Sequence, residues 1–128
     1  MNDSIYSHLD YCEFIKIASK ISGINYKSLA ASARIHTSYF SRVMQGKADF
    51  SKEQLYLISR DLKLKPEETE FLLLLGEYKS SSLESHKSFI LKKISLIQKE
   101  KQRLLNKLTT KTQELSTEDV AVYYQESI

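Results

Sequence analysis

The sequence predicts an all-α fold, made of a five-helix domain and a long helix that follows it. Gly and Pro, which tight turns between strands commonly require, number only 3 and 1 in 128 residues. Apolar residues recur with the helical period rather than in alternation, so no run predicts a strand. The composition, with 41% hydrophobic and 27% charged residues, is typical of a soluble globular protein.

The first helix is expected at residues 10–22. Its apolar side chains recur at the spacing that places them on one helix face, and they are Phe14, Ile17, Ala18 and Ile21. Asp10 and Glu13 have the spacing of a capping box at its start. Gly23 is expected to end the helix in the left-handed conformation that glycine adopts without steric cost.

Two short helices are expected next, at residues 26–33 and from 37 or 38 to 45. Asn25 is the expected N-cap of the first helix, and Gly46 is expected to end the second. The side chains that should face inwards from this pair are Leu29, Ala30, Ala33, Phe40, Val43 and Met44.

A fourth and a fifth helix complete a domain at residues 1–78. Ser51 and Gln54 have the spacing of a capping box. Pro66 fits the first turn of the fifth helix, because its missing N–H would have no partner there. The inward side chains of these two helices should be Leu55, Ile58, Leu62, Phe71, Leu72 and Leu75.

A linker at residues 79–82 is expected to lead into a long helix at residues 83–112. Ser81 and Glu84 repeat the spacing of a capping box. Apolar residues follow a seven-residue repeat that Lys87 and Lys101 interrupt, as in an imperfect coiled coil. We expect a dimerisation surface formed by Leu83, Ile90, Ile94, Ile97, Leu104 and Leu108.

Two alternatives stay open for the long helix. It can fold back on its own domain, or its basic face can lie along DNA or an acidic partner, through residues that include Lys92, Lys93, Lys99 and Arg103.

Residues 113–128 are expected to form a short C-terminal helix or tail, with Ser116 as a cap.

The basic residues are concentrated in two stretches, although the net charge is only +3. Between Lys27 and Lys52 there are five basic residues and one acid, Asp49. Between Lys87 and Lys111 there are eight basic residues and one acid, Glu100. Such local concentrations can steer a polyanion even where the global charge is small.

Other function classes lack the residues that they need. Cys12 is the single cysteine, which fits a reducing compartment, and the N-terminus has no signal pattern. The longest apolar run, at residues 71–75, is too short to span a membrane. The three histidines do not have metal-ligand spacing, and no glycine-rich phosphate loop occurs. We therefore expect a cytoplasmic protein with no metal, cofactor, catalytic residue or membrane partner, and not an enzyme.

The stretch from Asn25 to Lys52 has the spacing of a helix-turn-helix. That motif needs a small residue where its helices meet, an apolar residue after the turn, and two apolar residues three apart on the second helix. These residues are Ala30, Ile35, Phe40 and Val43. The separations of ten residues from Ala30 to Phe40 and thirteen to Val43 are those of the motif.

With that face buried, the polar side chains of the second helix face outwards, and none of them is acidic. Arginine can read guanine, and glutamine can read adenine, through paired hydrogen bonds in the major groove. We expect base readout by Thr37, Ser38, Ser41, Arg42 and Gln45. We expect contacts to the DNA phosphates from Lys27, Ser28, Lys47, Ser51 and Lys52.

This stretch resembles the phage-repressor-like (Cro/C1-type) helix-turn-helix family. More narrowly, Asp10-Tyr11 and residues 38–47 and 67–75 are similar to a paralogous bacterial family, whose members join such a domain to a C-terminal domain of unknown function. The tail, from Leu115 to Tyr124, resembles the start of that second domain, so the resemblance covers roughly residues 11–124. Two departures are Arg34, where the turn usually has glycine, and the absence of a full second domain from these 128 residues.

The resemblance implies a transcriptional regulator that inserts its third helix into the major groove of double-stranded DNA. A single helix-turn-helix covers one half-site, so a homodimer is expected. The alternative is an adaptor that keeps the fold, does not bind DNA and binds a protein partner through its long helix. Steep salt dependence of DNA binding would favour the regulator.

Overall fold

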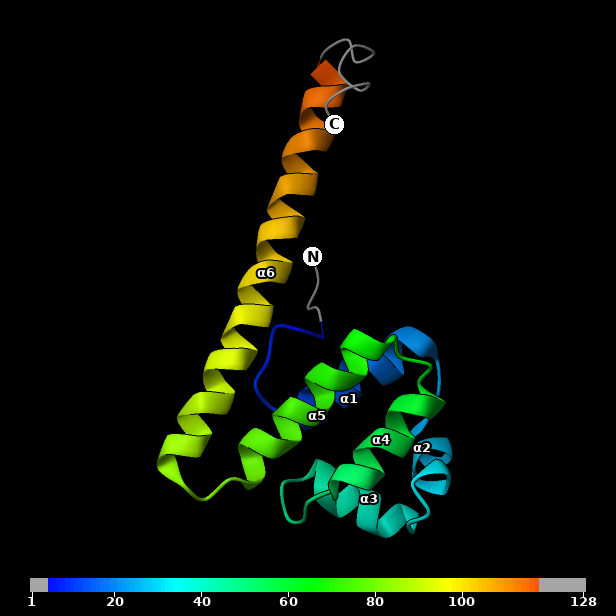
Figure 1. Ribbon diagram of the computed structural model, residues 1–128. Helices are drawn as coiled ribbons and strands as arrows, with labels where there is room; N and C mark the ends of the chain where they lie inside the picture. Colours follow the sequence, from blue (N-terminus) through cyan, green and yellow to red (C-terminus); the bar gives the residue numbers. More distant parts are fainter. Residues whose placement is uncertain (1–4, 118–128) are drawn as a thin grey trace.

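The computed structural model describes residues 5–117, with side chains as far as Lys107, and every regular element in that range is an α-helix (Figure 1). The predicted all-α class is therefore confirmed over these residues. The helices are α1 (Tyr11–Ser22), α2 (Tyr26–Ser32), α3 (Thr37–Met44), α4 (Lys52–Asp61), α5 (Pro66–Ser80) and α6 (Glu84–Thr117).

The predicted caps fix where the helices begin. The Asp10 carboxylate accepts a hydrogen bond from the Cys12 N–H at 3.0 Å, and Asn25 accepts one from the Ser28 N–H at 2.9 Å. Ser51 and Gln54 form the reciprocal capping box of α4. These bonds satisfy N–H groups that have no partner inside the helix, which is why the chain enters each helix at the expected residue.

Three successive helices end with the same left-handed turn. After α1, Gly23 (77°) is also left-handed, as predicted, and donates its own N–H to the Ser19 carbonyl. In the three turns that follow, the residues with positive φ are Arg34 (63°) after α2, Gly46 (84°) after α3 and Lys63 (57°) after α4. In each case the N–H of the next residue donates back to a carbonyl of the last helical turn, as Ile35 does to Ala30 at 3.0 Å. Arg34 and Lys63 adopt this conformation at a cost of about 1 kcal/mol each, because they carry a Cβ.

The core joins all the helices of the domain around three phenylalanine rings, Phe14, Phe40 and Phe71, none more than 1% exposed. The prediction for α1 was partly wrong. Ile21 is 75% exposed and Ile17 only half-buried, while the buried face also includes Tyr11 and Ile15. The inward predictions for α2 to α5 are confirmed except for Met44, which is half-buried.

The junction between α5 and α6 differs from the prediction. Helix α5 continues to Ser80, through part of the predicted linker, and α6 starts at Glu84. Ser81 therefore ends α5 instead of capping α6, and its hydroxyl lies 2.8 Å from Nδ1 of His86. At the other end α6 runs to Thr117, beyond the expected end at residue 112. The rest of the predicted tail, residues 118–128, lies outside the described residues.

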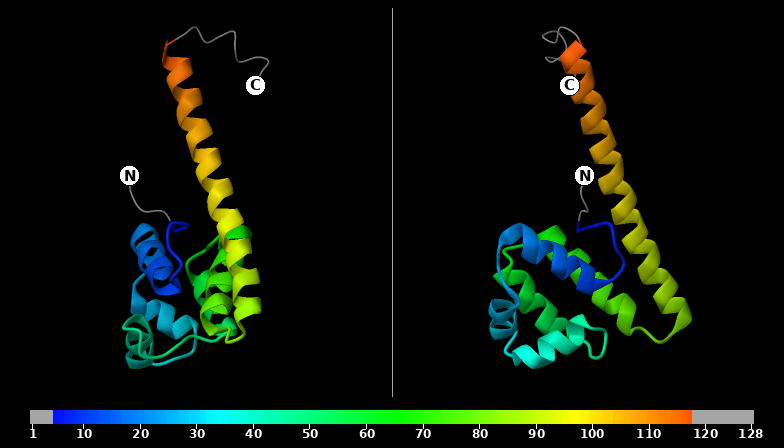
Figure 2. Two further views of the ribbon diagram at one scale, coloured as in Figure 1. Left: turned by 90° about the vertical axis from the view of Figure 1, so that its left-hand side faces the viewer. Right: turned by 180° about the vertical axis from the view of Figure 1, so that it is seen from behind.

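The first half of α6 packs against its own domain, and the second half extends past it (Figures 1 and 2). Ile90 and Ile94 are 1% and 0% exposed in the core shared with α5, and Ile97 packs against it. The Gln98 amide donates to the Tyr6 carbonyl at 3.0 Å.

The predicted dimerisation surface is therefore corrected for Ile90 and Ile94, because their own domain already covers them. Leu83 and Leu104 are 64% and 44% exposed, and the side chain of Leu108 lies outside the described residues. Within residues 5–117, no helix has both the length and the apolar run needed to cross a membrane.

Candidate nucleic-acid interface

Helices α2 and α3 meet through the side chains that the spacing predicted. Ala30, Phe40 and Val43 are at most 1% exposed, and Ile35 is half-buried against the same core. The Phe40 ring contacts the rings of Tyr26 and Phe50, with a centroid distance of 5.1 Å to each. The inner face of α3 is thus fixed by packing, which determines which side chains face outwards.

The five predicted base-reading side chains lie together on the outer face of α3, and all five are exposed. They are Thr37, Ser38, Ser41, Arg42 and Gln45. Helix α3 contains no acidic residue. Helix α6 packs on α5 and extends away from α3, so no described part of the C-terminal arm covers this face (Figures 1 and 2).

One of these five side chains has a structural partner. His36 is the N-cap of α3, and its Nδ1 accepts a hydrogen bond from the Ser38 N–H at 3.3 Å. The Ser38 hydroxyl lies 3.0 Å from the same nitrogen. A base contact by the Ser38 hydroxyl would therefore compete with its contact to His36. Among the hydrogen bonds of the described side chains, none engages the side chain of Arg42 or Gln45.

The predicted phosphate contacts fall into two groups at opposite ends of α4. Lys47 and Lys52 are exposed near its start. Lys27 is exposed at the start of α2. The start of α2 lies near the last turn of α4, since the Ser28 hydroxyl donates to Asp61 at 2.8 Å. Helix α4 has ten residues and is therefore about 15 Å long.

The two predicted serines differ in what they can still donate. The Ser28 hydroxyl already donates its one proton to Asp61, so the structure does not leave it available to a phosphate. The Ser51 oxygen accepts from the Gln54 N–H at 3.1 Å, and its proton can still be donated. Arg34 and Arg60, for which the sequence predicted no phosphate contact, line a shallow polar hollow together with Asp61.

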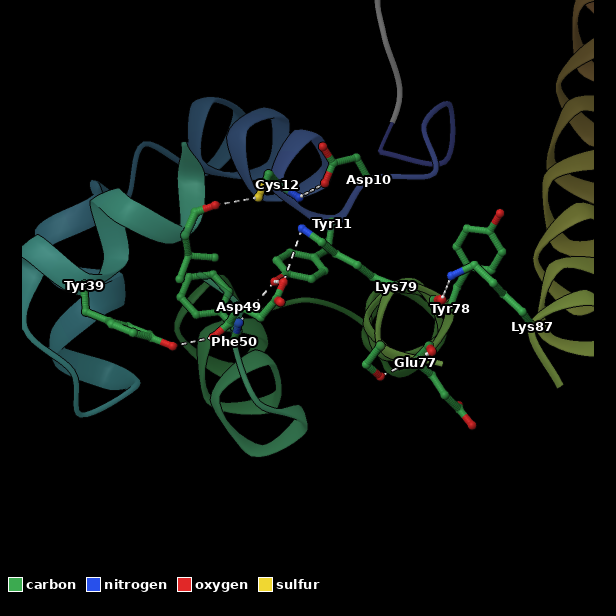
Figure 3. Close-up of polar contacts among 12 residues, drawn as sticks. Asp10, Tyr11, Cys12, Tyr39, Asp49, Phe50, Glu77, Tyr78, Lys79 and Lys87 are labelled. Carbon is green, nitrogen blue, oxygen red and sulfur yellow. Dashed lines mark hydrogen bonds and ion pairs between the residues drawn. The ribbon is translucent and has the colours of Figure 1, made fainter. Parts of the chain in front are cut away.

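The loop between α3 and α4 is held by Asp49, which makes contacts to three helices (Figure 3). Its carboxylate accepts from the Tyr11 hydroxyl at 2.8 Å and lies 3.2 Å from Nζ of Lys79. Its carbonyl accepts from the Tyr39 hydroxyl at 2.7 Å. The Tyr11 oxygen in turn accepts from the Phe50 N–H at 3.1 Å. We call Tyr11, Asp49 and Lys79 the loop clamp.

The loop clamp has consistent electrostatics. Hydrogen bonding from Tyr11, with the Lys79 ammonium, holds the pKa of Asp49 below its ordinary value of 3.8. Burial raises the pKa of the Tyr11 phenol, so it remains a neutral donor. The Lys79 ammonium lies 5.0 Å from the centre of the Tyr11 ring and pairs with the one acid between Lys27 and Lys52. The clamp thereby offsets the negative charge nearest to Lys47.

The sequence did not predict the clamp, although Asp49 is an isolated acid in a basic stretch. Tyr39 is half-buried, and its hydroxyl contacts the loop through the Asp49 carbonyl. Cys12 is buried, its thiol donates to the Val43 carbonyl at 3.3 Å, and burial raises its pKa to about 11. This thiol is therefore a structural group in the core.

Comparison with family models, curated proteins and solved structures found no match to this chain. The function therefore has to be inferred from the residues themselves. In the part of the chain that the structure describes, no group of three or more His, Cys, Asp or Glu side chains has the geometry to hold a metal ion. The outer face of α3 presents five exposed polar side chains on a helix whose inner face is fixed by buried packing.

Proposed function

We propose that this chain is a sequence-specific DNA-binding regulator of transcription, with α2 and α3 as a helix-turn-helix of the phage-repressor type. The observation that carries the proposal is the outer face of α3, which is exposed, free of acids and held by a buried inner face. An α-helix fits the major groove of B-form DNA, and an acid-free face can approach phosphates without repulsion. The protein would act in the cytoplasm.

Arg42 and Gln45 are the proposed base readers, because each can form two hydrogen bonds to one base edge. Thr37 and Ser41 lie beside them on the same face. The proposed phosphate contacts are Lys47 and Lys52 near the start of α4 and Lys27 near its end. The backbone of Lys47 is fixed next to α3, because its backbone N–H donates to the Arg42 carbonyl at 2.8 Å.

Selection of ligands from random duplex DNA by the whole chain, at a low and a high salt concentration, tests the proposal. We expect an enriched sequence at both concentrations and a steep fall in affinity with salt, since each neutralised phosphate releases counterions. A pool that stays random, or binding that salt does not change, would contradict it.

We also propose that the chain acts as a homodimer through the second half of α6. Helix α6 continues from the buried Ile94 to Thr117, and Leu104 and Leu105 are 44% and 55% exposed on it. Two copies would contact two half-sites and so double the number of contacts. Light scattering should give twice the mass of the chain, and Leu104→Glu with Leu105→Glu should halve it. A monomeric wild-type mass would remove this part of the proposal.

The second candidate function is a protein-interaction adaptor that does not bind DNA. The observation that favours it is a pair of large apolar side chains, Phe89 and Leu96, that α6 presents to solvent. The two functions are separated by the same selection, since an adaptor would enrich no DNA sequence.

A further inference from the structure

The outward side of α6 carries two large apolar side chains that nothing in the described chain covers. Phe89 is 58% exposed and Leu96 is 66% exposed. They are seven residues apart, which places them on one side of the helix about 10 Å from each other. The buried Ile90 and Ile94 point to the core from another side of the same helix. We call this surface, with its flanking basic residues, the outer strip.

Three lysines lie next to this pair on the helix surface, together with Ser85, His86 and Glu100. Lys92, Lys93 and Lys99 are exposed around Phe89 and Leu96. Nζ of Lys93 lies 5.3 Å from the centre of the Phe89 ring. The one acid among them, Glu100, forms an ion pair with Arg103 at 2.8 Å. The strip therefore presents an apolar centre inside a field of positive charge.

This combination favours one class of partner over the others. A helix face that is only solvated needs no Phe and Leu at its centre. Phosphates of DNA would use the lysines but leave the apolar pair in water. A membrane-surface helix buries a wide apolar face, whereas the apolar part of this strip is only two side chains in one line along the helix. An acidic protein segment with apolar side chains between its carboxylates would match both features.

We propose that the outer strip docks an acidic helical segment of another protein, with apolar side chains about 10 Å apart that cover Phe89 and Leu96. Carboxylates on either side of them would face Lys92, Lys93 and Lys99. The strip lies on α6, and the outer face of α3 lies on a different part of the domain (Figure 1). This docking specifies the kind of partner that the second candidate function would bind, and it does not depend on DNA binding.

Fluorescence anisotropy with the whole chain and two labelled helical peptides tests the docking. Both peptides are rich in Glu and have the same composition. In the first, two Leu residues are seven apart on one face; in the second, the same two lie on opposite faces. We expect the first peptide to bind about tenfold or more tightly than the second. Equal binding of the two, or no binding of the first, would overturn the proposal.

Two variants locate the binding on the strip. Phe89→Ser with Leu96→Ser removes the apolar centre, and Lys92→Glu with Lys99→Glu reverses the charge; each should weaken the first peptide by about tenfold or more. The matched control is Ile21→Ser with Lys20→Glu on α1, where Ile21 is 75% exposed. The control should bind as the wild type does.

Circular dichroism should give the same thermal midpoint for both strip variants as for the wild type, because all four side chains are exposed. If the serine variant unfolds, the charge-reversed variant decides the result. Peptide binding that neither variant weakens would overturn the proposal. The proposal would also be overturned if the chain bound phosphatidylglycerol vesicles or a DNA duplex and both variants weakened that binding as much as they weaken peptide binding. The strip would then bind another class of partner.

Discussion

Replacing Tyr11 with Phe removes a single hydroxyl from the centre of the loop clamp and changes little else. The hydroxyl donates to Asp49 at 2.8 Å and accepts from the Phe50 N–H at 3.1 Å. The ring itself is 1% exposed and would keep its packing against Phe50. The substitution therefore isolates the polar part of the clamp.

The expected cost follows from the two lost bonds. The hydrogen bond to Asp49 contributes about 1 kcal/mol to the free energy of unfolding. This value is smaller than that of a buried hydrogen bond to a charged group, because the Asp49 carboxylate is largely exposed. The Phe50 N–H is buried and would lose its partner, which costs about 1 to 3 kcal/mol. We expect the free energy of unfolding to fall by about 2 to 4 kcal/mol in total.

Urea unfolding at neutral pH measures this loss. The matched control is Tyr56→Phe, because Tyr56 is 48% exposed on α4 and the change there should cost less than about 0.5 kcal/mol. A loss for Tyr11→Phe no larger than that of the control would refute the reasoning about the clamp.

The same variant has a predictable pH dependence. The pKa of Asp49 is lowered in the folded chain, first by the Tyr11 hydrogen bond and then by Lys79. Its stabilisation is therefore fully present above the ordinary pKa of 3.8 and is lost as the pH falls through the folded value. The difference in stability between the wild type and Tyr11→Phe should shrink in acid, because the part due to the charge disappears. A difference that grows in acid would contradict the assignment.

Three further predictions follow from burial and backbone conformation. Ile94→Glu should destabilise the domain by about 3 to 5 kcal/mol in urea unfolding, because it places an unpaired charge at a fully buried position. A variant that becomes monomeric but keeps the stability of the wild type would contradict this. Lys63→Gly should stabilise it by up to about 1 kcal/mol, since glycine adopts a φ of 57° without strain; the matched Lys20→Gly change inside α1 should destabilise it. Native Cys12, with its pKa raised to about 11, should react with iodoacetamide at neutral pH about 100-fold more slowly than in urea, and equal rates would count against its burial.

The sequence was sufficient where a local signal decides the structure. Caps such as Asp10 and Ser51 and stops such as Gly23 and Gly46 act within a few residues, so the helix bounds could be predicted closely. The same holds for the outer face of α3, since the buried side chains at Phe40 and Val43 fix its orientation.

The sequence was insufficient where partners lie far apart in the chain. Tyr11 and Asp49 are 38 positions apart, and only the packing of α1 and α5 around the loop brings them together with Lys79. The seven-residue repeat of α6 could not distinguish packing on its own domain from packing on a second copy, and Ile94 does the former. Ile21 has the right spacing for the core, but it lies at the end of α1 beyond the packed face.

Arg42→Ala and Lys47→Ala, compared in one competition gel shift, give the most direct test of how the outer face of α3 works. The labelled site is the sequence enriched from random DNA, and the competitor is a random duplex. Arg42→Ala should lower the preference for the enriched site by about tenfold or more, whereas Lys47→Ala should weaken both duplexes alike and leave the preference unchanged. Equal loss of preference in the two variants, or none in either, would contradict base readout by α3.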